Sequence, residues 1–113
     1  MENGTHELTT KKCRPCEGGT PPLSPKEVSE LMRQLDGWEF LQTRIAKDYH
    51  FKNYYQTIAF VNAIAWISHR EDHHPDLTVE YNKCRVEYMT HAIGGLSEND
   101  FICAAKIDAL LKI

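Results

Sequence analysis

Four of the six histidines lie in one stretch of the chain, at His69, His73, His74 and His91. The imidazole group titrates close to neutral pH, so neighbouring histidines can give and take protons within one catalytic turnover. An elimination of water needs such a pair, because one group protonates the departing hydroxyl and another removes a proton from the adjacent atom. These four residues are therefore candidates for acid/base chemistry of that kind.

A predicted β-hairpin determines how two of these histidines are placed. Residues 77–81 and 84–90 each alternate apolar and polar side chains, as strands with one buried face do. Asn82 and Lys83 between them suit a two-residue turn. Tyr81 would then pair with Cys84.

The register of this hairpin is supported by a charge pair. Glu80 would face Arg85 on the outward side of the sheet, which favours this register over a one-residue slip. The same ladder brings His74 opposite His91. Pro75 can disturb the last step, so we expect these two histidines to be close rather than paired in the ladder.

His69 and His73 are four residues apart near the end of a predicted helix, which would place both on one helix face if the helix extends to His73. All four imidazoles would then converge on one pocket. An alternative is a metal site, because His69 and His73 have ligand spacing and His91 could be a third ligand. No glutamate follows His69 as in the zinc-protease helix motif, so acid/base chemistry is the preferred interpretation. A second alternative is a set of structural histidines at a helix end, which is less favoured for four clustered residues than for one.

Three helices and two hairpins must position these residues. The first helix begins at Ser24, whose hydroxyl forms a capping box with Glu27, and it ends before Gly37. The second runs from Asn53 towards Pro75, and the third begins at Ser97. The strand-like runs are 38–42, 45–51, 77–81 and 84–90. The order α-β-β-α-β-β-α predicts an α+β fold, a four-stranded antiparallel sheet with helices on one face.

Residues 1–23 are polar, rich in glycine, proline and threonine, and show no apolar periodicity. They are predicted to form a flexible leader that contains a Cys13-x-x-Cys16 motif, followed by a single domain at 24–113. The four cysteines occur in a chain without a secretion signal, so reduced thiols are expected.

The composition argues against two classes of partner. With 13 basic and 16 acidic side chains the formal net charge is -3, so no wide positive surface for nucleic acid is expected. The chain has no apolar signal region and no run of about 18 apolar residues, so neither secretion nor a membrane span is expected. A cytoplasmic location follows as the expectation.

Several motifs resemble those of the pterin-4a-carbinolamine dehydratase (4a-hydroxytetrahydrobiopterin dehydratase) family, especially its bacterial members. The resemblance rests on Cys13-Arg14-Pro15-Cys16, Gly37-Trp38, His50-Phe51-Lys52, His73-His74-Pro75-Asp76, Tyr81-Asn82-Lys83, Thr90-His91 and Gly94-Gly95-Leu96-Ser97-x-x-Asp100. It implies dehydration of 4a-hydroxytetrahydropterin to quinonoid dihydropterin, which recycles a tetrahydrobiopterin-type cofactor, with no metal and no cofactor of the enzyme's own. It also implies a homodimer or homotetramer and a functional link to an aromatic amino-acid hydroxylase.

The resemblance also assigns roles to residues. His73 and His91 would be the main acid/base groups, and His74 would help to hold the pterin and its hydroxyl. His69, Asp72 and Thr90 are assigned to substrate binding. At His69 the family often has a glutamate, so this position departs from its pattern. Asp100 matches the motif, and its preferred role is helix capping.

A different class of function is also implied. Animal relatives in this family act as dimerisation partners of a homeodomain transcription factor, so a binding module is the alternative to an enzyme. Turnover of a 4a-hydroxypterin at catalytic protein concentrations would separate the two.

Overall fold

The computed structural model describes residues 4–15 and 18–112, with residues 4–6 described by their backbone alone. In chain order the elements are α1 (Gly4–Thr9), α2 (Pro25–Met32), β1 (Glu39–Phe40), β2 (Ile45–His50), α3 (Tyr54–Glu71), β3 (Asp76–Val79), β4 (Lys83–Tyr88), the short 3-10 helix η1 (His91–Ile93) and α4 (Glu98–Leu110).

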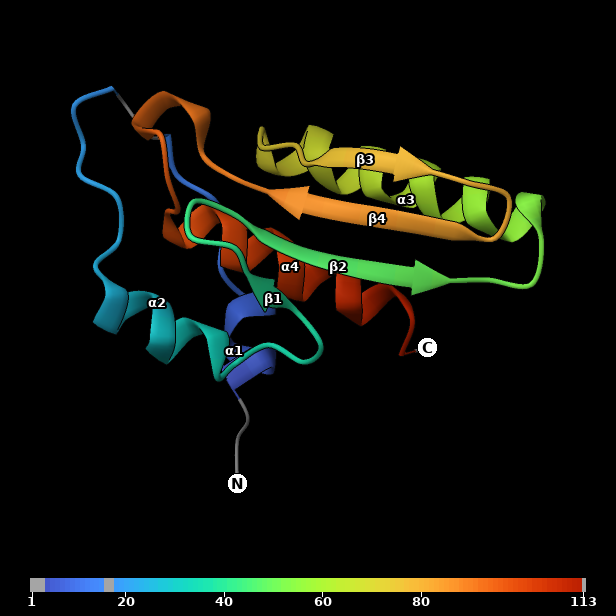
Figure 1. Ribbon diagram of the computed structural model, residues 1–113, viewed down its shortest axis with the longest axis horizontal. Helices are drawn as coiled ribbons and strands as arrows, with labels where there is room; N and C mark the ends of the chain where they lie inside the picture. Colours follow the sequence, from blue (N-terminus) through green and yellow to red (C-terminus); the bar gives the residue numbers. More distant parts are fainter. Residues whose placement is uncertain (1–3, 16–17, 113) are drawn as a thin grey trace.

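The four strands form one antiparallel sheet in the order β1-β2-β4-β3. Alternate residues of β4, Cys84, Val86 and Tyr88, are buried on the face that packs against the helices. Figure 1 shows α3 and α4 behind the sheet on that face. The predicted α+β class, with a four-stranded antiparallel sheet, is therefore confirmed.

Helix α4 lies at the centre of the core. Nine of its 13 residues are buried, from Asn99 to Asp108. An amphipathic surface helix would leave one side in water, whereas a helix that is apolar nearly all round needs partners on every side. It contacts α1, α2 and α3 as well as lying against the sheet (Figure 1).

Helix α3 begins at the predicted cap, where the Asn53 side chain accepts the backbone N–H of Gln56. It ends at Glu71, before the predicted stop at Pro75. The next residue, Asp72, takes a left-handed conformation with φ 52°. The backbone N–H groups of Asp72 and His73 both donate to the carbonyl of Ser68, which closes the helix end. The histidine pair therefore lies in a loop and not on the helix.

The hairpin of β3 and β4 has a register different from the predicted one. Val79 pairs with Cys84, and Arg85 lies opposite Thr78 rather than Glu80. The turn is one residue earlier than predicted, because Glu80 N–H donates to the Lys83 carbonyl at 2.8 Å. Relative to the prediction, one strand is shifted by two residues along the other. Side chains alternate between the two faces of a strand, so a shift by an even number leaves every side chain on its predicted face.

Contacts outside the hairpin account for the shifted turn. The carbonyl of Tyr81 accepts the hydroxyl of Thr57 at 2.9 Å, and the carbonyl of Asn82 accepts the N–H of Phe51 at 2.8 Å. These bonds attach the turn to α3 and to the end of β2. Local turn propensity contains no information about such partners.

The segment predicted to be a leader contains a helix, α1, and an irregular stretch where the chain is described. Helix α1 packs along α4, and its Leu8 is fully buried. Polar residues dominate the sequence here, so one buried leucine gives no periodic signal. Residues 11–15 continue along the domain as an irregular segment that we call the strap. Cys16 of the predicted Cys-x-x-Cys motif lies outside the described residues.

Candidate active site

A cavity of about 520 Å³ lies where the end of α3, the end of β4, the start of α4 and the strap meet. Five of the six predicted site residues line it: Asp72, His73, His74, Thr90 and His91. His74 and His91 line the same cavity, in agreement with their predicted proximity. If the observed ladder is extended beyond the hairpin, Met89 and not His91 lies opposite His74.

His73 is held from two sides. Its Nε2 lies 2.7 Å from Oδ1 of Asp100, and its ring stacks on Tyr88 with centroids 5.7 Å apart and planes at 9°. An ionised carboxylate has no proton to donate and can only accept hydrogen bonds, so Nε2 of His73 is the donor. Among the described residues Nδ1 has no hydrogen-bond partner, which leaves that nitrogen for a ligand.

Asp100 is fully buried and uses both of its oxygens. One oxygen binds His73, and Oδ2 accepts the hydroxyl of Thr90 at 2.8 Å and the backbone N–H of Ser97 at 3.0 Å. The sequence favoured capping alone for this residue. The structure shows that it caps α4 and also orients His73, because the two oxygens of a carboxylate can serve different donors.

The hydroxyl of Thr90 is part of this hydrogen-bond network. It donates to Asp100, and it lies 2.7 Å from the hydroxyl of Ser97. Its backbone pairs with Gly95 in an isolated bridge. Thr90 therefore closes the floor of the cavity, and the chain turns immediately into η1, which presents the exposed His91 at the cavity edge.

His69 is not part of the cavity. It is exposed on α3, and its ring lies against Trp66 with centroids 5.5 Å apart. The shared face with His73 was expected only if the helix reached His73, and α3 ends at Glu71. The structure therefore brings three of the four clustered histidines together.

The cavity also contains residues that the sequence did not single out. Glu71 accepts the backbone N–H of Cys13 at 2.8 Å and lies 3.2 Å from the ammonium group of Lys106. Burial alone would raise the pKa of Glu71, but these two donors outweigh it and hold the pKa below its usual value. Nothing local in the sequence signals a bond between residues 58 positions apart.

The thiol of Cys13 and the phenol of Tyr88 beside the cavity stay protonated. Cys13 Sγ lies 3.5 Å from Cys103 Sγ, and this contact together with burial holds the pKa of Cys13 well above its usual range. Burial likewise raises the pKa of Tyr88. A thiol in that state is a poor nucleophile. The other titratable side chains that line the cavity are its imidazoles, its carboxylates and its lysine and arginine residues.

Two further properties concern cofactors and membranes. In the described part of the chain, no three histidine, cysteine, aspartate or glutamate side chains are grouped so that they could hold a metal ion. The alternative zinc site would need His69 beside His73 and His91, and His69 lies elsewhere. None of the helices in residues 4–15 and 18–112 has the length and apolar character needed to cross a membrane.

Fold and site together define a class: a small α+β protein with a carboxylate-oriented histidine in a pocket lined by two more histidines. Comparison with known proteins supplies the family. The sequence pattern of the family described as "Pterin 4 alpha carbinolamine dehydratase" matches residues 21–110. The chain belongs to this dehydratase family, a family of hydro-lyases.

Individual relatives agree with this assignment. A protein of Nitrosospira multiformis named "Putative pterin-4-alpha-carbinolamine dehydratase" is 70% identical over 113 residues, which cover 100% of both chains. One of the same name from Nitrosomonas europaea is 66% identical and covers 94% of this chain and 95% of its own. A solved structure from Brucella melitensis, titled a transcriptional coactivator/pterin dehydratase, has a TM-score of 0.76 at 31% identity and covers 79% of this chain and 97% of its own.

Proposed function

We propose that the protein dehydrates a 4a-hydroxytetrahydropterin to the quinonoid dihydropterin, with His73, His74 and His91 acting on the substrate. The observation that carries this proposal is the His73–Asp100 pair, 2.7 Å apart, in a cavity that also contains the other two histidines. Membership of the dehydratase family supplies the substrate class.

The reaction breaks one carbon–oxygen bond and needs two proton movements. A protonated imidazole gives a proton to the departing 4a-hydroxyl, which leaves as water, and a neutral imidazole removes the proton of the neighbouring ring nitrogen. His73 and His91 are the two main acid/base residues in this proposal. His74 and the exposed Asp72 hold the pterin, with the backbone at Thr90 forming part of the cavity wall.

Asp100 is a positioning residue in this mechanism. It is fully buried, so it does not reach the substrate, but it fixes which nitrogen of His73 carries its proton and in which direction the ring points. The stack on Tyr88 restricts the ring further. Such restraint lowers the entropic cost of reaching the reactive geometry.

In the cell, this reaction would recycle a tetrahydrobiopterin-type cofactor after an aromatic amino-acid hydroxylase has used it. A cytoplasmic location is part of the same proposal.

The test is turnover of a chemically generated 4a-hydroxytetrahydropterin. We expect rate acceleration at catalytic concentrations, and we expect His73→Ala and His91→Ala each to lower it about a hundredfold or more. His50→Ala is the matched control, because His50 is an exposed histidine on β2 away from the cavity. Folded variants that keep nearly full activity would refute the acid/base assignment. A wild-type protein that binds the pterin without accelerating its loss would indicate a binding module instead.

A further inference from the structure

The strap forms one wall of the cavity and is fixed there by several bonds. The N–H of Cys13 donates to Glu71, and the N–H of Arg14 donates to the Asn99 side chain at 3.0 Å. The Asn99 amide in turn donates to the carbonyl of Arg14. Lys12 Nζ donates to the carbonyl of Arg70 at 2.9 Å. A segment held in this way at both backbone and side chains has a defined position relative to the histidines.

The strap lies outside the part of the chain that defines the family. The family pattern matches residues 21–110, whereas the strap is residues 11–15. It nevertheless contributes Lys12, Cys13, Arg14 and Pro15 to the cavity lining. The matched family pattern therefore does not account for this wall of the cavity.

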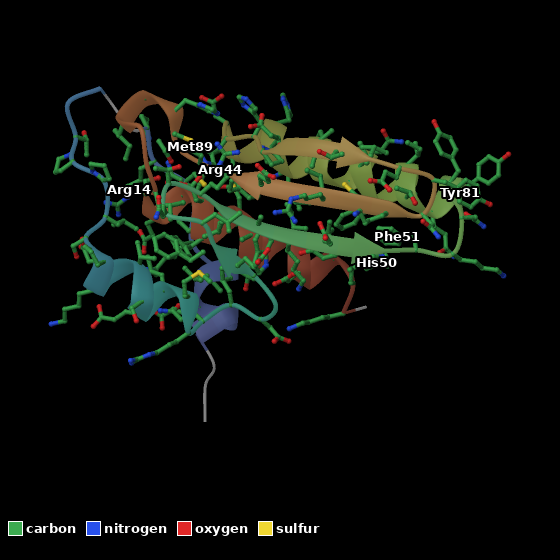
Figure 2. The ribbon with its side chains drawn as sticks, in the orientation of Figure 1. Arg14, Arg44, His50, Phe51, Tyr81 and Met89 are labelled. Carbon is green, nitrogen blue, oxygen red and sulfur yellow. The ribbon has the colours of Figure 1, made fainter. Side chains whose placement is uncertain are left out.

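The strap places positive charge at the cavity. Lys12 and Arg14 line it together with Arg70 from the end of α3. Within residues 4–15 and 18–112, neither the Arg14 nor the Arg70 guanidinium forms an ion pair with a carboxylate. Figure 2 shows Arg14 and Met89, another lining residue, at the same end of the molecule.

The lining of the cavity has three basic side chains, Lys12, Arg14 and Arg70, against two carboxylates. Glu71 is already bound to Lys106 and to the N–H of Cys13, and Asp72 is the other carboxylate in the lining. The whole chain has a net charge of -3, so three cations on one cavity are a local feature and not a general basic character. Unpaired guanidinium groups beside a cavity suit a phosphate or carboxylate, which they bind through paired hydrogen bonds.

We propose that Arg14 and Arg70, with Lys12, form a subsite for a phosphate or carboxylate group on the side chain of a reduced pterin, so that anionic pterins bind better than neutral ones. This inference rests on the proposed function for the pterin ring itself. The cavity of about 520 Å³ is in the size range that accommodates a drug-sized molecule, which leaves room for a side chain beside the ring.

The direct test is a fluorescence titration of the purified full chain with three ligands that share the ring. These are neutral dihydroneopterin, its phosphate monoester, and dihydrofolate, whose side chain carries carboxylates. We expect the monoester or dihydrofolate to bind about tenfold more tightly than dihydroneopterin, and the preferred ligand shows which anion the subsite takes. The preference should shrink as salt is raised. Equal affinity for all three ligands would overturn the proposal.

Two variants assign the effect to the residues. Arg14→Gln and Arg70→Gln should each reduce the preference several-fold while affinity for neutral dihydroneopterin stays within about twofold. Arg33→Gln is the control, because Arg33 is an exposed arginine at the end of α2 that does not line the cavity. Equal weakening of neutral and anionic ligands in the two cavity variants would mean that these arginines only shape the wall, which also overturns the proposal.

Turnover of a neutral 4a-hydroxytetrahydropterin, measured on the same samples, separates this inference from the proposed function. Turnover without a charge preference removes only the anion subsite. Absence of turnover removes the dehydratase proposal, whereas the binding preference is still determined by the titration.

Discussion

At the scale of single residues, the feature that organises the site is the carboxylate of Asp100. It is fully buried and accepts hydrogen bonds from an imidazole, a hydroxyl and a backbone N–H of the α4 cap. A buried charge with several donors is stable, and removal of its charge affects every partner. Asp100 therefore joins the stability of the start of α4 to the orientation of His73.

Asp100→Asn should lower dehydratase turnover about tenfold or more, because the amide can no longer fix the ring of His73 through a charged acceptor. Its neighbour Ser97 provides the comparison. Ser97→Ala removes a cap that does not touch His73 and should cost about 1 kcal/mol of unfolding free energy with little change in turnover. Thermal unfolding and steady-state rates of both variants test this. Equal rate losses in the two would mean that Asp100 acts through helix stability alone.

The sequence predicted that His73, His74 and His91 would lie close together, and all three line one cavity because hydrophobic pattern and turn chemistry bring their segments together. It misplaced His69, since the end of α3 depends on the left-handed Asp72 and not on the proline that follows. It also underestimated Asp100, because a helix-capping carboxylate has the same sequence signature whether or not a histidine lies above it.

At the scale of secondary-structure elements, the sheet is joined to α4 through Asp108. This buried carboxylate accepts the indole N–H of Trp38 at 3.0 Å, the ammonium group of Lys47 at 2.9 Å and the hydroxyl of Tyr49. Burial, with Asp108 as a further cause, holds the pKa of Tyr49 well above its usual range, so the phenol is the donor. Trp38, whose ring lies 6.3 Å from that of Tyr88, is thus a core aromatic behind the site.

Asp108→Ala should lower the unfolding free energy by about 3 kcal/mol or more, because it leaves a partly buried ammonium and two buried donors without their acceptor. Asp48→Ala is the matched control. Asp48 is an exposed aspartate that pairs with Arg85, so its loss should cost less than about 1 kcal/mol. Urea denaturation of the two variants gives both values. Similar midpoints would show that Asp108 is not a central contact.

A pH-dependent effect is expected where the strap meets Glu71. The folded-state pKa of this carboxyl is held below its usual value, so its ionised form stabilises the fold at neutral pH, and this contribution is lost as the pH falls through the depressed pKa. Glu71→Gln should therefore cost about 1 kcal/mol near neutral pH and nothing in acid.

Glu98→Gln is the control for Glu71→Gln. Glu98 is exposed, and its ion-pair partner, Lys11, belongs to the strap, as does the Cys13 that Glu71 binds. The cost of Glu98→Gln near neutral pH should be smaller than that of Glu71→Gln. Unfolding free energies measured across the acid range test both variants. A cost of Glu71→Gln that stays constant down to low pH would contradict the role of its charge.

At the scale of the whole molecule, the fold class was predictable because two predicted hairpins, one of them strictly alternating, and three capped helices leave few ways to bury their apolar faces. The register of the second hairpin and the strap were not predictable. Both depend on bonds between distant segments, such as Thr57 with Tyr81 and Cys13 with Glu71. The strap in particular is a polar segment whose partners supply all of its order.

We expect the predicted homo-oligomer to form through the edges of the sheet and not through its open face. Its open face carries a charged network in which Arg85 binds Asp48 at 3.0 Å and Glu87 at 2.9 Å. Burying that network against a second copy would be costly, whereas the backbone of the edge strands β1 and β3 can pair with another chain. We expect light scattering to show a dimer or tetramer that persists in high salt. A monomer at high concentration would contradict this prediction. Dissociation by salt would indicate that the copies contact each other through the charged face instead of the edge strands.

The bonds of the strap determine at which point of protein synthesis the cavity becomes complete. The hydrogen bond between Arg14 and Asn99 spans 85 positions, and the thiol contact of Cys13 with Cys103 spans 90. A growing chain therefore contains the strap long before it contains the helix that receives it. Closing so long a loop costs entropy that only the packed core repays. A pterin in the cell thus meets a complete cavity only after α4 has been translated and packed, so it cannot serve as a template for the earlier steps of folding.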